Sequence, residues 1–205
     1  MRSLTADLAV DDHLIRVVET ALNRWDRIDV LINNAGIDVN EPFLEATRQG
    51  WEHVLAVNLT APFRLSQLAA RAMANQGKGA IVNIASIDAY GTDGTFASYT
   101  ASKAALLALT RQAATELAPS GIRVNSVSPG WTTTAMAAGA LTPDELATMK
   151  TRFDRVPIQR MITPDEVASA VAYLASDAAS AITGTDLVVG GGTLANLYII
   201  ETLNN

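Results

Sequence analysis

The sequence predicts an α/β fold in which a doubly wound parallel sheet carries helices on both faces. Short apolar segments with strand character alternate along the chain with helical segments of ten or more residues. Parallel strands need connections of about that length, whereas antiparallel strands can be joined by a tight turn. At 205 residues, 49% of them hydrophobic, the chain suits one domain with a sizeable core. We therefore expect residues 1–205 to form a single domain.

The apolar segments are rich in β-branched and small residues, and each ends at polar or turn-forming residues. The predicted strands are residues 2–6, 28–32, 80–85, 122–127 and 186–189. The carboxyl ends of parallel strands meet at one edge of the sheet, and ligands of such folds bind outside that edge. We expect the functional site there.

Residues suited to a site follow the first four predicted strands. Asp7 follows the first strand, and Asn-Asn-Ala-Gly at residues 33–36 follows the second. Ser86 follows the third strand, and Pro-Gly at residues 129–130 follows the fourth. Because these signals are independent of one another, their agreement favours a functional edge over a set of unrelated turns. The glycines at 190–192 follow the last strand and are interpreted as a turn.

Helices are predicted between the strands. Pro62 interrupts one of them, because proline lacks the amide hydrogen that a helix needs. Two others open with the same Thr-Pro-Asp-Glu sequence, which is typical of a capping box with proline at the first helical position. One predicted helix starts near residue 11. The others cover residues 50–75, 98–118, 143–152 and 164–176.

Composition excludes several classes of function. The chain has 15 Lys and Arg against 21 Asp and Glu, and its net charge of -6 offers no footprint for nucleic acid or an anionic membrane. It has no Cys and only two His, His13 and His53, so we expect no thiolate chemistry and no metal site. There is neither an apolar run of membrane-spanning length nor a signal-peptide core. We expect a cytoplasmic protein.

The strongest chemical signal is the segment from Ser86 to Lys103. Tyr99 and Lys103 are four residues apart and share one face of a helix. An ammonium beside a phenol favours the phenolate and lowers the phenol pKa from its usual value of about 10. With the Ser86 hydroxyl, the pair forms an acid/base site for an alcohol or a carbonyl. Taken alone, the pair is more typical of ordinary helix surface, which would account for roughly nine such matches in ten.

Asn58 lies four residues before Pro62 in a predicted helix. Its carbonyl would accept a hydrogen bond from the amide of residue 62, which proline does not have. We expect a bend there and a free Asn58 carbonyl that holds a water linked to Lys103. A kink at the surface, relieved by solvent, is the alternative.

Together these motifs resemble the short-chain dehydrogenase/reductase family of the single-domain type. Ser86 precedes Tyr99 by 13 residues, which is the usual gap in that family. The resemblance extends from residue 2 to residue 192 and implies a Rossmann-like sheet. The matching motifs, in chain order, are Asn33-Asn34-Ala35-Gly36, Val57-Asn58-Leu59, Ser86, Tyr99-x-x-x-Lys103 and Pro129-Gly130.

The resemblance implies an oxidoreductase that transfers a hydride between NAD or NADP and a secondary alcohol or ketone. Tyr99 would be the general acid/base, and Ser86 would hydrogen-bond the substrate oxygen. Lys103 would bind the nicotinamide ribose and lower the Tyr99 pKa, while Asn58 would hold a relay water. The residues implied in cofactor binding, besides Tyr99 and Lys103, are Asp7, Leu8, Asn34, Ala35, Gly36, Pro129, Gly130, Thr132 and Thr134.

The resemblance also implies a substrate lid and a partner. The region 131–163 would be the lid, with Trp131, Met136 and the loop 87–94 shaping the substrate pocket. The helices at 50–75 and 98–118 would pair with those of a second copy to give a homodimer or homotetramer. Apolar residues of the tail 194–205 could pack on a partner subunit.

One family motif does not occur in these 205 residues. The family's first strand is followed by Thr-Gly-x-x-x-Gly-x-Gly, whose backbone and helix N-terminus hold the cofactor diphosphate. Met1 falls where the family's third strand begins. We therefore expect an N-terminal truncation of two strand–helix units, on the order of 50 residues at about 30 per βαβ unit. Residues 2–6 would then lack a neighbouring strand, and residues 28–32 would form an exposed apolar edge.

Two functions remain open. The acid/base residues favour an oxidoreductase, whereas the missing glycine-rich loop favours a non-catalytic remnant that serves only folding or oligomerisation. An epimerase or dehydratase is disfavoured, because such relatives carry a larger substrate domain than this length allows.

Overall fold

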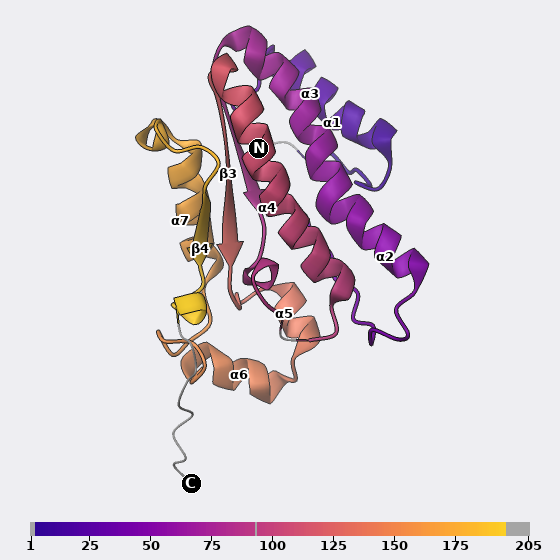
Figure 1. The fold of residues 1–205 in the computed structure, drawn as a ribbon, viewed down its shortest axis with the longest axis vertical. Coiled ribbons are helices and arrows are strands. Elements are labelled where there is room, and N and C mark those ends of the chain that lie inside the picture. Colours follow the sequence, from indigo (N-terminus) through magenta and orange to yellow (C-terminus); the bar gives the residue numbers. More distant parts are fainter. Residues whose placement is uncertain (1–2, 93, 196–205) are drawn as a thin grey trace.

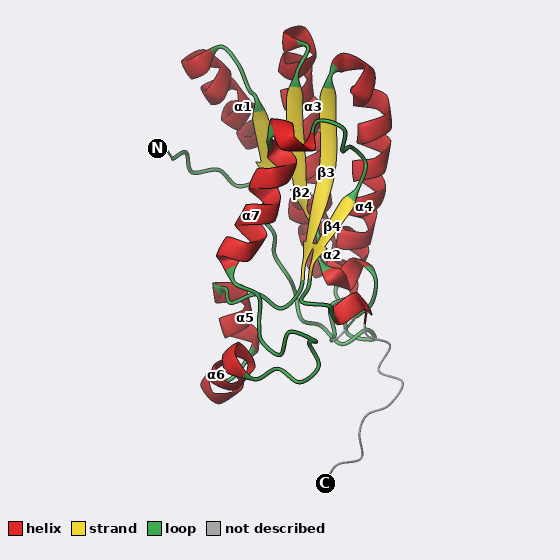
Figure 2. Ribbon diagram, turned by 90° about the vertical axis from the view of Figure 1, so that its left-hand side faces the viewer, coloured by secondary structure: helices red, strands yellow, loops and turns green. Residues whose placement is uncertain are grey.

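The computed structural model describes residues 3–92 and 94–195, and its centre is a sheet of four parallel strands (Figure 2). The strands lie side by side in the order β1-β2-β3-β4. They are β1 (Val30–Asn33), β2 (Gly79–Ile84), β3 (Ile122–Pro129) and β4 (Asp186–Val189). All four match predicted strands within a few residues, and the predicted parallel sheet is confirmed.

Helices cover both faces of the sheet (Figure 1). Two long helices, α3 and α4, pack on one face, and α7 packs on the other. α1 lies beside α3 on the same face of the sheet and packs on it through Leu14 and Val18. The helices of these layers are α1 (Asp11–Trp25), α2 (Arg48–Leu55), α3 (Ala61–Gln76), α4 (Ala97–Leu117) and α7 (Pro164–Ala175).

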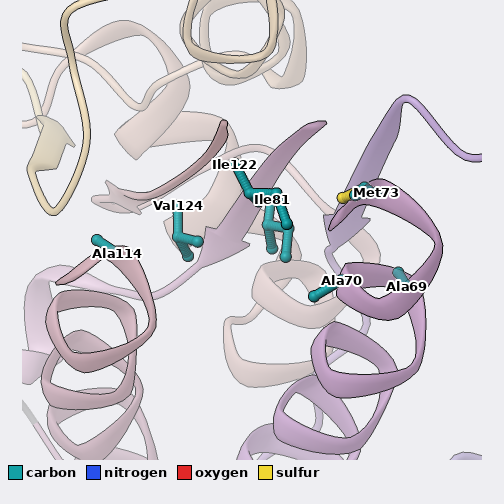
Figure 3. Packing of buried hydrophobic residues seen from close by; sticks show 7 residues of the cluster. All are labelled: Ala69, Ala70, Met73, Ile81, Ala114, Ile122 and Val124. Atoms are coloured by element: carbon teal, nitrogen blue, oxygen red, sulfur yellow. The ribbon is translucent and has the colours of Figure 1, made fainter. Parts of the chain in front are cut away.

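The core follows the alternation of side chains along each strand. Ile81 of β2 and Val124 of β3 point toward α3 and α4, where they meet Met73 and Ala114 (Figure 3). Val82, the next residue of β2, lies on the opposite face with the cluster beneath α7. Both faces of the central strands are therefore buried, and the buried residues include the polar Asn83 of β2 and Asn125, Ser126 and Ser128 of β3.

The strand predicted at residues 2–6 is wrong over the part that the structure describes, because residues 3–6 have no regular structure. A strand needs a neighbour for its backbone hydrogen bonds, and β1 pairs only with β2 among the described residues. The expectation that the β1 segment forms an apolar edge is confirmed, since Val30 and Ile32 are 42% and 38% exposed. The predicted tail contacts lie mainly outside the described residues.

Pro62 divides the helix predicted at 50–75. α2 begins after its cap Thr47, and a wider π-helical turn (Ala56–Thr60) connects it to α3. In this turn the Ala61 amide donates to the Ala56 carbonyl, five residues back. The widened turn accommodates the proline without a break in the helix.

Two further helices, α5 (Ala135–Ala140) and α6 (Pro143–Thr151), lie beyond the carboxyl ends of the strands (Figure 2). The capping boxes predicted at Thr142 and Thr163 are both formed. In each, the threonine hydroxyl accepts from the glutamate amide and the glutamate carboxylate accepts from the threonine amide. The short α5 was not predicted. No helix in the described part of the chain is long and apolar enough to cross a membrane.

Replacing Ile81 by alanine tests the core assignment. Ile81 is fully buried between β2 and the α3–α4 layer, so Ile81→Ala leaves a cavity and should lower the free energy of unfolding by about 2–5 kcal/mol. Urea denaturation measures the change. Ile32→Ala, on the exposed edge, is the control and should cost less than about 1 kcal/mol. Equal losses in the two variants would contradict the packing described here.

Candidate active site

A cleft of about 690 Å³ opens at the carboxyl ends of the strands, at the edge where the sequence predicts the site. Residues from β1, β2 and β3 and the loops that follow them form much of its wall, together with α4, α5 and α7. The predicted site residues that line this cleft are Asn34, Gly36, Ser86, Tyr99, Lys103, Pro129, Gly130, Thr132 and Thr134.

Ser86 is held by the turn that follows β2. It precedes a single 3-10 turn (Ile87–Ala89), and its Oγ accepts a hydrogen bond of 3.1 Å from the Asp88 amide. The Ile87 side chain is buried and anchors the turn. Ser86 is itself 7% exposed and lines the cleft. Its hydroxyl therefore has a fixed backbone and still borders the cavity.

Tyr99 and Lys103 lie in the first turns of α4, as predicted. The Lys103 Nζ is 5.4 Å from the centre of the Tyr99 ring. Lys103 is only 3% exposed, and its ammonium donates a hydrogen bond of 2.8 Å to the Ile84 carbonyl at the end of β2. The helix face that carries the pair therefore packs against the strand end and borders the cleft, so it is not ordinary helix surface.

Burial changes the charge state of Lys103. Removal from water disfavours the ammonium and lowers the pKa of Lys103 from 10.5 to about 8, while the nearby Asp88 carboxylate acts in the opposite direction. The ammonium is thus the major form near neutral pH, but it loses its proton far more readily than a surface lysine does.

Asn58 contributes through its side chain, which the sequence analysis did not foresee. The side chain is fully buried, its Oδ1 accepts from the Ile37 amide at 2.9 Å, and its Nδ2 donates to the Ile37 carbonyl at 2.8 Å. Nδ2 also donates to the Ser102 Oγ at 3.2 Å. Asn58 therefore ties the segment after β1 to α4. The sequence does carry a signal for this buried role, because Asn58 is a polar residue between the apolar Val57 and Leu59. The proposed water at the Asn58 carbonyl stays a prediction.

Gly36 lies where the chain passes close to Lys103. A side chain at this position would place its Cβ 3.3 Å from the Lys103 Nζ and 3.5 Å from the Asn58 Oδ1. The first contact is tighter than ordinary packing, whereas the second is an ordinary van der Waals contact. The glycine thus leaves bare backbone beside the buried ammonium, which is the arrangement expected where a ligand approaches closely.

The loop after β3 forms another wall. The Gly130 amide donates to the Val189 carbonyl of β4 at 3.0 Å, and the Thr132 Oγ1 donates to the Gly130 carbonyl at 2.9 Å. Thr132 also forms an isolated parallel bridge with Ile162. The two ends of the predicted lid region, 131–163, are therefore joined at its base. Trp131 and Met136, predicted to shape the pocket, line the cleft.

Four predicted site residues do not line the cleft. Asp7 caps its own turn, with Oδ1 accepting from the Ala9 amide at 2.9 Å, and Leu8 packs with the α1–α3 cluster. Ala35 is exposed between the lining residues Asn34 and Gly36. Asn58 is buried and holds the segment at Ile37 rather than lining the cleft itself. The adenine contact of Asp7 and Leu8 stays a prediction.

Lining residues that the sequence analysis did not single out include Asp38, Phe96 and the apolar face of α7. The described residues contain no group of three or more potential metal ligands.

A family model described as enoyl-(acyl carrier protein) reductase matches residues 1–193. The chain belongs to the short-chain dehydrogenase/reductase family. It is 41% identical over 190 residues to cis-4-hydroxycyclohexanecarboxylate dehydrogenase of Sinomonas cyclohexanicum, a match that covers 92% of this chain and 75% of that protein. The predicted enzyme class, an NAD(P)-dependent dehydrogenase or reductase, is confirmed.

Solved structures of the short-chain dehydrogenase/reductase family share the fold. A short-chain type dehydrogenase/reductase from Mycobacterium marinum superposes with a TM-score of 0.87 at 33% identity, over 94% of this chain and 75% of that one. A gluconate 5-dehydrogenase from Burkholderia cenocepacia, in complex with NADP and tartrate, gives 0.86 at 30% identity, over 93% and 74%. The predicted Rossmann-like fold is confirmed.

The cleft fits the nicotinamide and ribose portion of the cofactor that this family uses. Gly36 leaves room beside the Lys103 ammonium, which is a hydrogen-bond donor, and Thr132 and Thr134 add hydroxyl groups to the lining. The glycines at 190–192 follow β4 and lead into a single 3-10 turn (Thr193–Ala195), so they do not open a helix that could hold a diphosphate. This agrees with their interpretation as a turn.

Lys103 should make the stability of the protein depend on pH. Its folded pKa of about 8 lies below the 10.5 of an exposed lysine, so between these values the unfolded chain binds more protons. Stability should therefore rise with pH through this window, by about 3 kcal/mol in total. Denaturation series across the window measure the rise.

Lys103→Met should remove this rise in stability, whereas Lys150→Met, which changes an exposed lysine of α6, should retain it. Parallel pH profiles for the wild type and Lys103→Met would contradict the burial of the ammonium.

Proposed function

We propose that the chain transfers a hydride between NAD(P)(H) and a secondary alcohol or ketone, with Tyr99 as the general acid/base. The observation that carries the proposal is the convergence of Tyr99, Ser86 and Lys103 on one cleft at the carboxyl edge of the sheet. This trio combines a proton donor, a neutral hydrogen-bond donor and a fixed positive charge. Tyr99 is the one tyrosine and Lys103 the one lysine among the lining residues, and all of these lining residues are described by the structure.

Tyr99 moves the proton. In ketone reduction its phenol donates a proton to the developing alkoxide, and in alcohol oxidation the phenolate accepts the hydroxyl proton. The Lys103 ammonium, 5.4 Å from the ring centre, favours the phenolate through its charge. Ser86 donates a hydrogen bond to the same substrate oxygen and orients it toward Tyr99. The bound nicotinamide supplies or accepts the hydride.

Lys103 and Asn58 support this step from behind the cleft wall. The hydrogen bond from Lys103 to the Ile84 carbonyl fixes the ammonium beside Tyr99, and its remaining hydrogens would be available to the ribose hydroxyls of a bound cofactor. Asn58 holds the segment around Ile37 against α4, so Gly36 stays close to Lys103. A water at the Asn58 carbonyl would return the proton to solvent. The residues proposed to hold the cofactor in the cleft are Asn34, Gly36, Lys103, Pro129, Gly130, Thr132 and Thr134.

The region 131–163 is proposed to act as the substrate lid. It contains α5 and α6, and the hydrogen bond of 2.8 Å from the Ile162 amide to the Trp131 carbonyl closes its base. Met136, Ala137 and Ala140 of α5 line the cleft and give this wall an apolar surface. Two helical segments are proposed to pair with the same segments of a second copy of the chain. One is α2 together with α3, and the other is α4. Phe63 on α3 is 47% exposed, and the small residues Ala104 and Ala108 are exposed on α4.

Tyr99→Phe tests the proposed role directly. The change removes only the hydroxyl, so turnover of alcohol or ketone should fall by at least about 100-fold while cofactor affinity changes little. Initial rates followed by NAD(P)H absorbance, with cofactor binding measured separately, give both quantities. Tyr173→Phe, on an exposed part of α7, is the matched control and should keep full activity. Activity in Tyr99→Phe close to that of the wild type would remove Tyr99 from the mechanism.

A non-catalytic role is the second candidate, favoured by the exposed β1 edge and by the absence of a glycine-rich loop from residues 1–205. Titration with NADH and NADPH, followed by nicotinamide fluorescence, separates the two candidates. The oxidoreductase proposal predicts saturable binding of at least one cofactor, weakened by Lys103→Met, because the ribose hydroxyls lose their donor. If neither cofactor binds at millimolar concentrations, this chain alone is not an enzyme and the second candidate stands.

A further inference from the structure

We infer that Asp88 selects the substrate: the cleft takes secondary alcohols or ketones with a hydrogen-bond donor on the neighbouring carbon and rejects those with a carboxylate there. The donor is a hydroxyl or an ammonium group. This inference rests on the proposed function, because it concerns the same cleft and the same reacting carbon. It adds the class of substrate, which neither the family nor the acid/base residues specify.

The position of Asp88 follows from the turn that holds Ser86. The Asp88 amide donates to the Ser86 Oγ at 3.1 Å, so the two residues belong to one rigid 3-10 turn whose buried anchor is Ile87. Both Ser86 and Asp88 line the cleft. With Ser86 on the substrate oxygen, the Asp88 side chain is two residues further along this turn. Because Asp88 shares this turn with Ser86, we assign it to the part of the substrate next to the reacting carbon.

The charge of the cleft favours a donor and opposes an anion. Among its lining residues, all of which the structure describes, the acids are Asp38 and Asp88 and the one cation is Lys103. Lys103 is 3% exposed and donates to the Ile84 carbonyl, and its remaining hydrogens are assigned to the cofactor ribose rather than to a substituent of the substrate. The Asp88 carboxylate also acts electrostatically on Lys103, so its charge is felt at the residue beside Tyr99.

The chemistry of a carboxylate completes the selection. Ionised, it accepts hydrogen bonds only, with about four lone-pair sites on its two oxygens, so it retains capacity for a ligand when it also has a protein partner. Hydrogen bonds to a charged group are among the stronger ones, and a like charge at the same place is repelled. Trp131, Met136 and Ala137 also line the cleft, and none of them carries a positive charge that would compensate an anion.

Four alcohols that share one six-membered ring test the inference. They are cyclohexane-1,2-diol, 2-aminocyclohexanol, cyclohexanol and 2-hydroxycyclohexanecarboxylate, which differ only at the carbon next to the reacting one. Relative kcat/KM with NAD(P) is the measurement. The diol or the amino alcohol should exceed cyclohexanol by about tenfold, and the carboxylate should rank last. A wild-type preference for the carboxylate would overturn the inference.

Asp88→Asn assigns the selection to this residue and separates the two donors. The amide keeps the shape and one acceptor but loses the charge, so the hydroxyl preference should largely persist while an ammonium preference disappears. The carboxylate should gain about tenfold relative to cyclohexanol. Because the change also acts on Lys103, and so on every substrate alike, ratios between substrates are compared rather than absolute rates. Asp12→Asn, at the exposed start of α1 and away from the cleft, is the control and should leave all ratios unchanged.

A binding measurement covers the case in which no alcohol is turned over. With Trp25 and Trp51 replaced by Phe, Trp131 is the remaining tryptophan and lies in the cleft wall. Its fluorescence should respond to the diol or the amino alcohol at lower concentration than to the carboxylate, and Asp88→Asn should reduce that difference. No turnover with this binding order would reject the proposed function and keep the selection by Asp88. A preference against the carboxylate that stays within about twofold of the wild type in Asp88→Asn, by rate or by binding, would reject the selection.

Discussion

The burial of the Lys103 ammonium is the constraint on which the site depends. A charge removed from water is costly unless it is well hydrogen-bonded, and here the end of β2 supplies the Ile84 carbonyl at 2.8 Å. This requirement fixes how α4 lies against the strand and keeps Tyr99 beside the ammonium. It also explains Gly36, whose missing side chain lets the backbone after β1 pass next to Lys103. Asn58 then holds that backbone in place through Ile37.

A buried chain of polar side chains supports the same region from inside the sheet. Asn33 of β1 donates to Asn83 of β2 at 2.8 Å and to Ser66 of α3 at 3.1 Å, and Asn83 donates to Thr110 of α4 at 2.9 Å. Such bonds lock register, because a shift of one residue would leave buried polar groups unpaired. The strand ends that carry the site are thus aligned by the interior of the fold, and the cleft inherits its geometry from that alignment.

The cleft combines this rigid polar side with a more open apolar side. Ser86, Tyr99 and Lys103 occupy the side built on β2 and α4, while α5 and α7 contribute mainly Ala, Val and Met. The exposed edge of β1 adds Val30 and Ile32 to the same cavity. A wall of this kind favours the body of an organic substrate but does little to distinguish one substrate from another. Discrimination therefore depends on the few charged groups, of which Asp88 shares its turn with Ser86.

Local chemistry and periodicity allowed much of this protein to be predicted from its sequence. The apolar segments of β2, β3 and β4, the capping boxes at Thr142 and Thr163, and the placement of Tyr99 near Ser86 all depend on neighbouring residues or on the common edge of a parallel sheet. The tertiary structure alone decided what depends on distant partners. Residues 3–6 are not a strand because no neighbouring strand pairs with them. Asn58 acts through its contacts with Ile37 and Ser102. α7 lines the cleft because it packs on the face of the sheet opposite α4. Hydrogen-bond partners and burial of this kind are set by the folded chain, so no local pattern encodes them.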